Sequence, residues 1–109
     1  MDVAERIASA LVSSRKAACV NIVPGVVSVY TWKGKVEKDS ELLLMIKTRQ
    51  EHVAALTDLV KSLHPYEVPE VIALPIEGGS PGYLRWVQET TSDHDGDAKE
   101  MRPDPNSVV

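Results

Sequence analysis

Hydrophobic positions along the chain repeat with a helical period in three segments. Apolar residues recur at helical spacing over residues 2–15 and again over residues 48–63, which predicts two amphipathic helices. A shorter segment, residues 81–87, begins with the proline of a Ser-Pro pair and predicts a third helix. The first two helices each open with a capping-box pattern, namely Asp2 with Glu5 and Thr48 with Glu51.

Between the first two helices the pattern changes to that of two long strands. Residues 18–32 are rich in β-branched side chains, and the Pro-Gly pair at 24–25 predicts a bulge within them. Residues 41–47 are apolar almost without a break, which indicates burial on both faces of a strand. The chain reverses at 33–34 or at 38–39. Such a long hairpin on a small domain needs cover, and we expect another copy of the chain to supply it.

A last apolar segment follows the second helix. Residues 71–74 are bracketed by Pro69 and Pro75, which predicts a short strand. The order helix, strand, strand, helix, strand, helix is typical of an α+β domain with its helices on one face of the sheet. We expect residues 1–90 to form this domain. Residues 91–109 are acidic and nearly free of apolar residues, and we expect a disordered acidic tail.

Composition narrows the class of protein. The chain has 109 residues, enough for one domain, and a formal net charge of −4, so we expect no nucleic-acid partner. No apolar run approaches the ~20 residues that a membrane span needs. The one cysteine, Cys19, excludes an internal disulfide and fits a reducing compartment. With no signal peptide visible, we expect a cytoplasmic location.

Two side chains of the predicted ordered part are soft or borderline metal ligands. Cys19 supplies a thiol and His64 an imidazole, a combination that suits copper or zinc, and Glu67 adds a carboxylate near His64. A site for copper or another divalent cation is therefore one interpretation. The other is structural: Cys19 lies in an apolar strand and is buried there, and His64 partners the last carbonyls of the second helix.

Polar and aromatic residues are expected to converge at the strand ends. They suit a small-ligand pocket or a subunit interface, where Tyr and Trp are enriched. The sequence holds no nucleophile-elbow motif and no Gly-rich phosphate loop before a helix, so we expect no enzymatic activity. The residues of this pocket or interface are Tyr30, Trp32, Lys47, Tyr66, Glu70 and Trp86.

Five segments in order resemble the CutA family, the divalent-cation tolerance proteins, and most closely its animal members. The resemblance implies a ferredoxin-like fold, a tight homotrimer built through the long hairpin strands, and architectural kinship to PII signalling proteins. It also implies binding of copper or other divalent cations, no established enzymatic activity and, in animal members, a link to acetylcholinesterase. The segments are KAACVNIVPG (16–25), SVYTWKGK (28–35), IKT (46–48), HPYEVPEVIALP (64–75) and YLRW (83–86).

The sequence differs from the family at two places. The family has a strand before its first helix, so the resemblance implies a βαββαβ plan plus a C-terminal helix with the N-terminal strand missing. We then expect residues 71–74 to lack a partner beside 41–47, which leaves an exposed sheet edge and a less stable chain that joins trimers of full-length copies. Leu63 stands where some members have a second histidine, so among the family's copper ligands only His64 has a match.

Two functions follow from the sequence. The first is a non-enzymatic homotrimer with roles in divalent-metal tolerance or binding and in protein interaction, such as acetylcholinesterase localisation. The alternative is a PII-like sensor of a small ligand, with its site between subunits near Tyr66 and Lys47.

Overall fold

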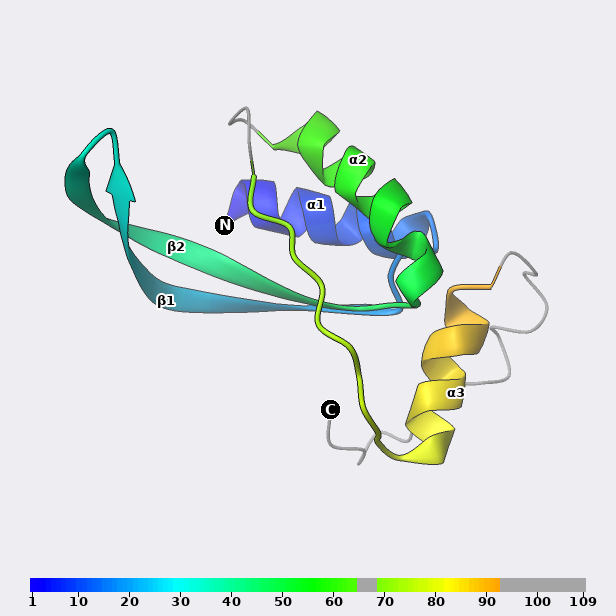
Figure 1. Ribbon diagram of the computed structural model, residues 1–109. Coiled ribbons are helices and arrows are strands. Elements are labelled where there is room, and N and C mark those ends of the chain that lie inside the picture. The colour runs from blue at the N-terminus through cyan, green and yellow to red at the C-terminus, as the bar shows by residue number, and fades with distance from the viewer. Residues whose placement is uncertain (65–68, 93–109) are drawn as a thin grey trace.

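Three α-helices and one long hairpin form the part of the chain that the computed structural model describes, residues 1–64 and 69–92. α1 and α2 cover one end of the hairpin, whose other end projects away from all helices (Figure 1). No helix among these residues has the length and hydropathy to cross a bilayer. The elements are α1 (Asp2–Ser13), β1 (Cys19–Trp32), β2 (Lys35–Lys47), the 3-10 turn η1 (Gln50–His52), α2 (Val53–Leu63) and α3 (Pro81–Thr90).

The hairpin reverses at the first of its two predicted turns. Trp32 pairs with Lys35, which leaves the two residues between them as the loop. Lys33 and Gly34 have φ angles of 51° and 78°. Positive φ at both loop residues is the type I′ turn that matches the twist of two antiparallel strands. The other predicted turn is wrong, because residues 38–39 lie inside β2.

A bulge interrupts the pairing where the Pro-Gly pair predicts one. Val23 pairs with Leu43 and Val26 with Glu41, so two residues of β1 stand opposite one residue of β2. Gly25, with φ at 79°, supplies the left-handed conformation that such a bulge requires. The bulge divides the hairpin into a part beside the helices and a projecting part.

The helix starts differ from the predicted capping boxes. Met1 is the N-cap of α1, and its carbonyl accepts from the Glu5 N–H at 2.9 Å, with no side-chain cap. The Thr48 hydroxyl donates instead to the Lys16 carbonyl at 2.6 Å, which ties the end of β2 to the segment before β1. Both capping-box predictions are therefore wrong. Ser80 is the N-cap of α3 as predicted, with proline at the first helical position.

The hydrophobic core lies between α1, α2 and the near end of the hairpin. Leu11 is fully buried at its centre. Partly buried side chains from both strands and from the segment after α2 close it, including Val20, Leu44 and Val71. The buried members of the cluster are Ile7, Leu11, Ala17, Leu56 and Val60.

The apolar run in β2 is covered on one face only. Leu44 and Ile46 pack against the core, whereas Leu43 and Met45 are 47% and 49% exposed. The prediction of burial on both faces is therefore wrong for a single chain. Successive residues of a strand point to opposite faces, so only the face toward the helices finds cover.

The strand predicted at 71–74 does not form. Residues 69–80 have no regular secondary structure, and the sheet of the described residues has two strands, β1 and β2. A strand needs a neighbour for its main-chain groups, and the described residues place none beside this segment. The fold is α+β, with the order of a ferredoxin-like domain in which no strand precedes α1 within the described residues.

Candidate metal site and subunit interface

His64 lies where α2 ends. Its N–H donates to the Val60 carbonyl at 2.8 Å, and its backbone is extended, with φ −82° and ψ 137°. A residue that precedes proline avoids helical dihedrals, so the local sequence stops the helix here as predicted. Glu67 and Tyr66, the predicted neighbours of His64, lie outside the described residues. Glu70 follows them and is exposed.

Cys19 begins β1 at the base of the hairpin and is partly buried. Its neighbour is Tyr83 of α3, whose hydroxyl is buried with no hydrogen-bond partner among the described residues. Burial first, and the adjacent Cys19 side chain second, raise the pKa of the Tyr83 phenol. Within residues 1–64 and 69–92, no three His, Cys, Asp or Glu side chains gather closely enough to hold a metal ion.

Three of the predicted pocket residues, Lys47, Tyr30 and Trp32, do not converge within one chain. Lys47 pairs with Cys19 at the base of the hairpin, and its ammonium group donates to the Asn21 side chain. Tyr30 and Trp32 lie near the turn at the other end. Twelve strand residues between these ends span roughly 40 Å. A single chain therefore offers no pocket that contains all three side chains.

The projecting part of the hairpin has a polar ladder on one face. Tyr30 stands opposite Glu37 in register, but its hydroxyl donates diagonally to the Asp39 carboxylate. Ser28 makes the same diagonal contact to Glu41 at 2.8 Å. The Asp39 hydrogen bond is the main cause that raises the pKa of Tyr30 to about 12, and nearby carboxylates add to it.

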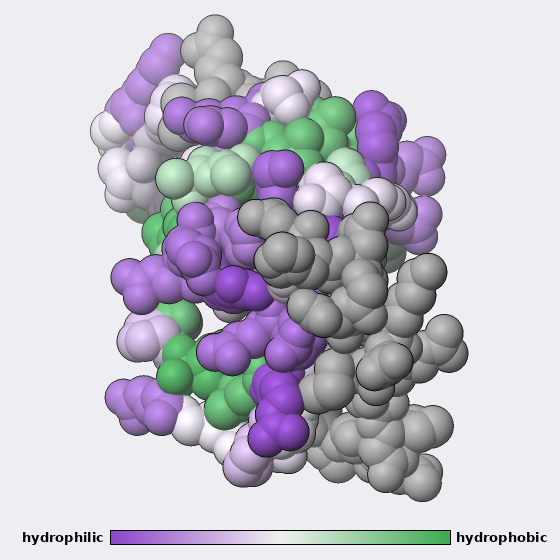
Figure 2. Space-filling model, turned by 90° about the vertical axis from the view of Figure 1, so that its right-hand side faces the viewer, coloured by the Kyte–Doolittle hydropathy of each residue, from purple (hydrophilic) through white to green (hydrophobic). Residues whose placement is uncertain are grey.

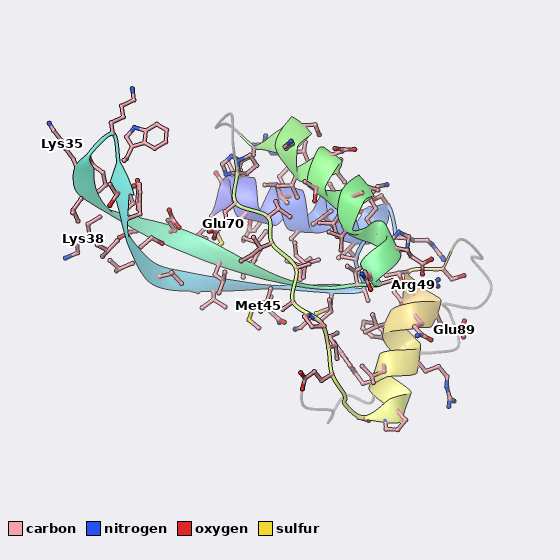
Figure 3. All side chains as sticks on the ribbon, in the orientation of Figure 1. Lys35, Lys38, Met45, Arg49, Glu70 and Glu89 are labelled. Atoms are coloured by element: carbon pink, nitrogen blue, oxygen red, sulfur yellow. The ribbon has the colours of Figure 1, made fainter. Side chains whose placement is uncertain are left out.

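The opposite face of the projecting part carries three exposed valines, which stand across from Ser40, Lys38 and Thr31 in the register. Val27, Val29 and Val36 are 54%, 65% and 76% exposed, and the register puts their side chains on one face. Trp32 on the ladder face is 61% exposed, with the Lys33 ammonium group 5.8 Å from its ring centroid. Figure 3 shows Lys35 and Lys38 at the far end, well away from the helices. Apolar surface on a projecting hairpin is typical of an interface.

Arg49 is a site residue that the sequence reasoning missed. Its Nε donates to the Gln88 carbonyl at 3.1 Å and to the Thr91 hydroxyl at 3.0 Å, and it pairs with Glu51 at 3.2 Å. Figure 3 shows Arg49 beside the end of α3 that carries Glu89. An arginine at a helix C-terminus satisfies carbonyls that have no partner within the helix. No sequence pattern predicts this contact, because its main acceptor is the backbone carbonyl of Gln88, and a residue of any type would supply that group.

An open groove of about 970 Å³ lies next to Arg49. Its apolar wall comes from α3 and from the segment before it, and Figure 2 shows apolar surface among hydrophilic side chains on this side of the molecule. Each nitrogen of the Arg49 guanidinium already donates to α3 or to Glu51. Its lining residues are Thr48, Arg49, Gln50, Glu51, Ile76, Leu84, Val87, Gln88 and Glu89.

Trp86 packs against Tyr83 on α3, with ring centroids 5.5 Å apart and planes tilted by 37°. Both side chains are partly buried, so this aromatic pair helps to fix α3 beside the base of the hairpin. Thr91, just after α3, is 1% exposed, and the His52 ring contacts its carbonyl at 2.9 Å. The packed part of the chain therefore includes Thr91. Residues 93–109 of the predicted tail lie outside the described residues.

The fold and the surface together define an α+β protein with a long projecting hairpin. One face of the hairpin carries the polar ladder, and the other carries the exposed valines. Comparison with known proteins gives the family. Residues 1–90 match the family described as CutA1 divalent ion tolerance protein. The chain belongs to this family.

Relatives from several kingdoms share the match. The mouse protein named CutA is 60% identical over 89 residues, which are 82% of this chain and 50% of the mouse protein. The structure of Cut A1 from Thermus thermophilus has a TM-score of 0.82 at 53% identity and covers 84% of this chain and 89% of its own. CutA1 from Oryza sativa has a TM-score of 0.82 at 52% identity, with 86% of each chain covered. This chain spans about half the length of its curated mouse relative.

Proposed function

We propose that this chain is a non-enzymatic subunit of a homotrimer that takes part in divalent-cation tolerance. The observation that carries the proposal is the exposure of three valines on one face of the projecting hairpin, Val27, Val29 and Val36. A monomer would leave this face in water, whereas neighbouring copies would bury it. Family membership supports the same assembly. The PII-like alternative stays a proposal, because its site near Tyr66 and Lys47 lies between subunits and Tyr66 is outside the described residues.

Light scattering tests the assembly. The 11.9 kDa chain is expected to elute with three times that mass. Val29→Asp puts a carboxylate where the proposed contact buries a valine, and it is expected to lower the mass toward that of one chain. Val12→Asp is the matched control, because Val12 is 43% exposed on α1, away from the hairpin, and should leave the mass unchanged. A monomeric wild type, or equal masses for both variants, would refute the assembly.

The proposal assigns copper, or another divalent cation, to His64 and Glu67. Among the described residues no three-ligand group is complete, so the remaining ligands have to come from residues outside the described part or from a second copy. Cys19 contributes less to this proposal, because it packs beside Tyr83 at the base of the hairpin. When bound, the cation would be held by an imidazole nitrogen and carboxylate oxygens, ligands that copper and zinc accept.

Isothermal titration with Cu²⁺ and Zn²⁺ tests the metal assignment. His64→Ala is expected to weaken binding by about tenfold or more, as loss of a ligand does. His52→Ala is the control, because the His52 ring is engaged with the Thr91 carbonyl. Copper binds exposed imidazoles adventitiously, so weak binding that both variants reduce equally counts against a built site.

The proposal also includes a protein-interaction role in the cytoplasm. The single thiol, Cys19, fits a reducing compartment. Kinship with animal CutA proteins supports a link to acetylcholinesterase retention, which the hairpin surface would serve through the trimer. Co-precipitation of acetylcholinesterase by wild type and not by Val29→Asp is the expected result. Absence of the enzyme from the wild-type precipitate would remove this part of the proposal.

A further inference from the structure

Ser80 is the one serine or threonine of this sequence that a proline follows. In the fold, Ser80 is the N-cap residue of α3, and Pro81 is the first helical residue. This position accounts for the proline, because its fixed φ suits the first turn of a helix. It does not account for the serine hydroxyl, which makes no capping hydrogen bond to the helix.

The described surroundings of Ser80 are open. Residues 72–80 are all exposed, and Pro81 and Gly82 continue this exposed surface. A Cβ atom added at Gly78 or at Gly82 would meet no atom of another segment within 4 Å. Figure 1 shows the start of α3 at the end of the molecule that lies away from α1 and α2. The described residues therefore leave the Ser80 hydroxyl accessible to a second protein.

The backbone around Ser80 suits a protein kinase, which binds its substrate as an extended chain. Ser80 itself is extended, with φ −60° and ψ 122°, and residues 69–80 have no regular secondary structure. The Leu84 N–H donates to the Ser80 carbonyl at 3.0 Å and so closes the first turn of α3. Gly82 weakens this turn, because glycine loses more conformational freedom in a helix than any other residue. The turn can therefore open at a low cost when a kinase binds.

We propose that Ser80 is a phosphorylation site for a proline-directed protein kinase. The Ser80 Oγ attacks the γ-phosphorus of ATP that is bound to the kinase. The Oγ–P bond forms while the bond from the γ-phosphorus to the bridging oxygen breaks, the hydroxyl proton passes to the catalytic aspartate of the kinase, and ADP leaves. Proline-directed kinases select the residue after the acceptor, because proline brings no N–H that the kinase would have to satisfy.

The added phosphate meets main-chain donors at the start of α3. Pro81 has no N–H, so the first N–H groups of the helix are those of Gly82 and Tyr83, and neither has an acceptor within the helix. A dianionic phosphate on the N-cap residue accepts from them and is favoured by the helix dipole. Phosphorylation therefore tightens the first turn of α3. The proposal is independent of the trimer and of the metal, because it uses neither the projecting hairpin nor His64.

Incubation of the full chain with ATP, Mg²⁺ and an active mitogen-activated protein kinase tests the proposal, and mass spectrometry locates the phosphate. The wild type is expected to gain one phosphate, on Ser80, and Ser80→Ala none. Pro81→Ala keeps the hydroxyl but is expected to react at least about tenfold more slowly, because the alanine N–H has no acceptor in the kinase. Ser62→Ala is the control and should react as the wild type does, since Ser62 is exposed on α2 but leucine follows it.

A peptide of residues 76–84 separates the Ser-Pro pair from its position in the fold. The peptide and the full chain are expected to be phosphorylated at similar rates. In the phosphorylated chain, amide hydrogen exchange at Gly82 and Tyr83 is expected to slow. Phosphorylation of the peptide but not of the full chain would show that Ser80 is covered in the protein and would overturn the proposal. Equal incorporation in the wild type and Ser80→Ala, no incorporation in either chain or peptide, or unchanged exchange at α3 would each count against it as well.

Discussion

At the scale of single residues, the contact between Tyr30 and Asp39 sets a measurable property of the hairpin. The phenol donates to the carboxylate, which raises the Tyr30 pKa from 10.0 to about 12. At a pH between these two pKa values, the Tyr30 phenol keeps its proton in the folded chain and loses it in the unfolded chain. The contribution to stability is therefore complete below pH 10 and disappears as the pH rises through about 12.

Asp39→Asn is expected to lower the Tyr30 pKa toward its ordinary value, because the amide is uncharged and no longer favours the protonated phenol. Phenolate absorbance, taken as the difference between this variant and the same variant with Tyr30→Phe, isolates the one tyrosine. Glu37→Gln is the control and should lower the pKa less, since Glu37 acts on the phenol only through its charge. An unchanged titration in Asp39→Asn would show that the hydrogen bond is not the cause.

At the scale of elements, Arg49 connects the end of β2 to the end of α3. Its guanidinium binds the Gln88 carbonyl and the Thr91 hydroxyl while its side chain stays 29% exposed. Arg49→Met keeps the length of the side chain and removes the donors. We expect a loss of about 2 kcal/mol in the free energy of unfolding, the magnitude typical of hydrogen bonds to a charged group.

Urea unfolding followed by tryptophan fluorescence measures the effect of Arg49→Met. The control is Arg85→Met, because Arg85 is exposed on α3 itself. Equal midpoints for the two variants would mean that Arg49 does not hold α3 in place.

Local signals account for the elements that the sequence predicts correctly. The helical period, the proline after His64 and the Pro-Gly pair at 24–25 each act through neighbouring residues, so the helices, the helix end and the bulge follow from them. The capping boxes fail for the opposite reason. The Thr48 hydroxyl is taken by the carbonyl of Lys16, which is distant in sequence. The contacts of Arg49 with α3 are equally non-local and leave no pattern along the chain.

The candidate site was predictable only as a set of residue types. The sequence identifies His64 and the aromatic residues of the hairpin, but their separation depends on the register of twelve strand residues, which places Lys47 and Trp32 at opposite ends. The strand predicted at 71–74 fails because a strand exists only with a neighbour, and that condition is a property of the whole fold.

At the scale of the whole molecule, the core is small for the apolar surface that the chain carries. The buried apolar residues are concentrated around Leu11 at one end of the hairpin, while Val29, Val36 and Leu74 face solvent. A domain with a small core is marginally stable alone. The proposed association would bury the hairpin and so contribute to the stability of each subunit, which links the two quantities by mass action.

The linkage predicts that the thermal midpoint rises with protein concentration. A shift upward is expected between about 1 µM and about 100 µM chain, because only the folded subunit associates. Val29→Asp should lower the midpoint at high concentration and remove most of its dependence on concentration, whereas Val12→Asp should keep that dependence. Calorimetry across this range measures both effects. A wild-type midpoint that is the same at both concentrations would show that the single chain is stable without its partners, and that the exposed valines of the hairpin serve some other contact.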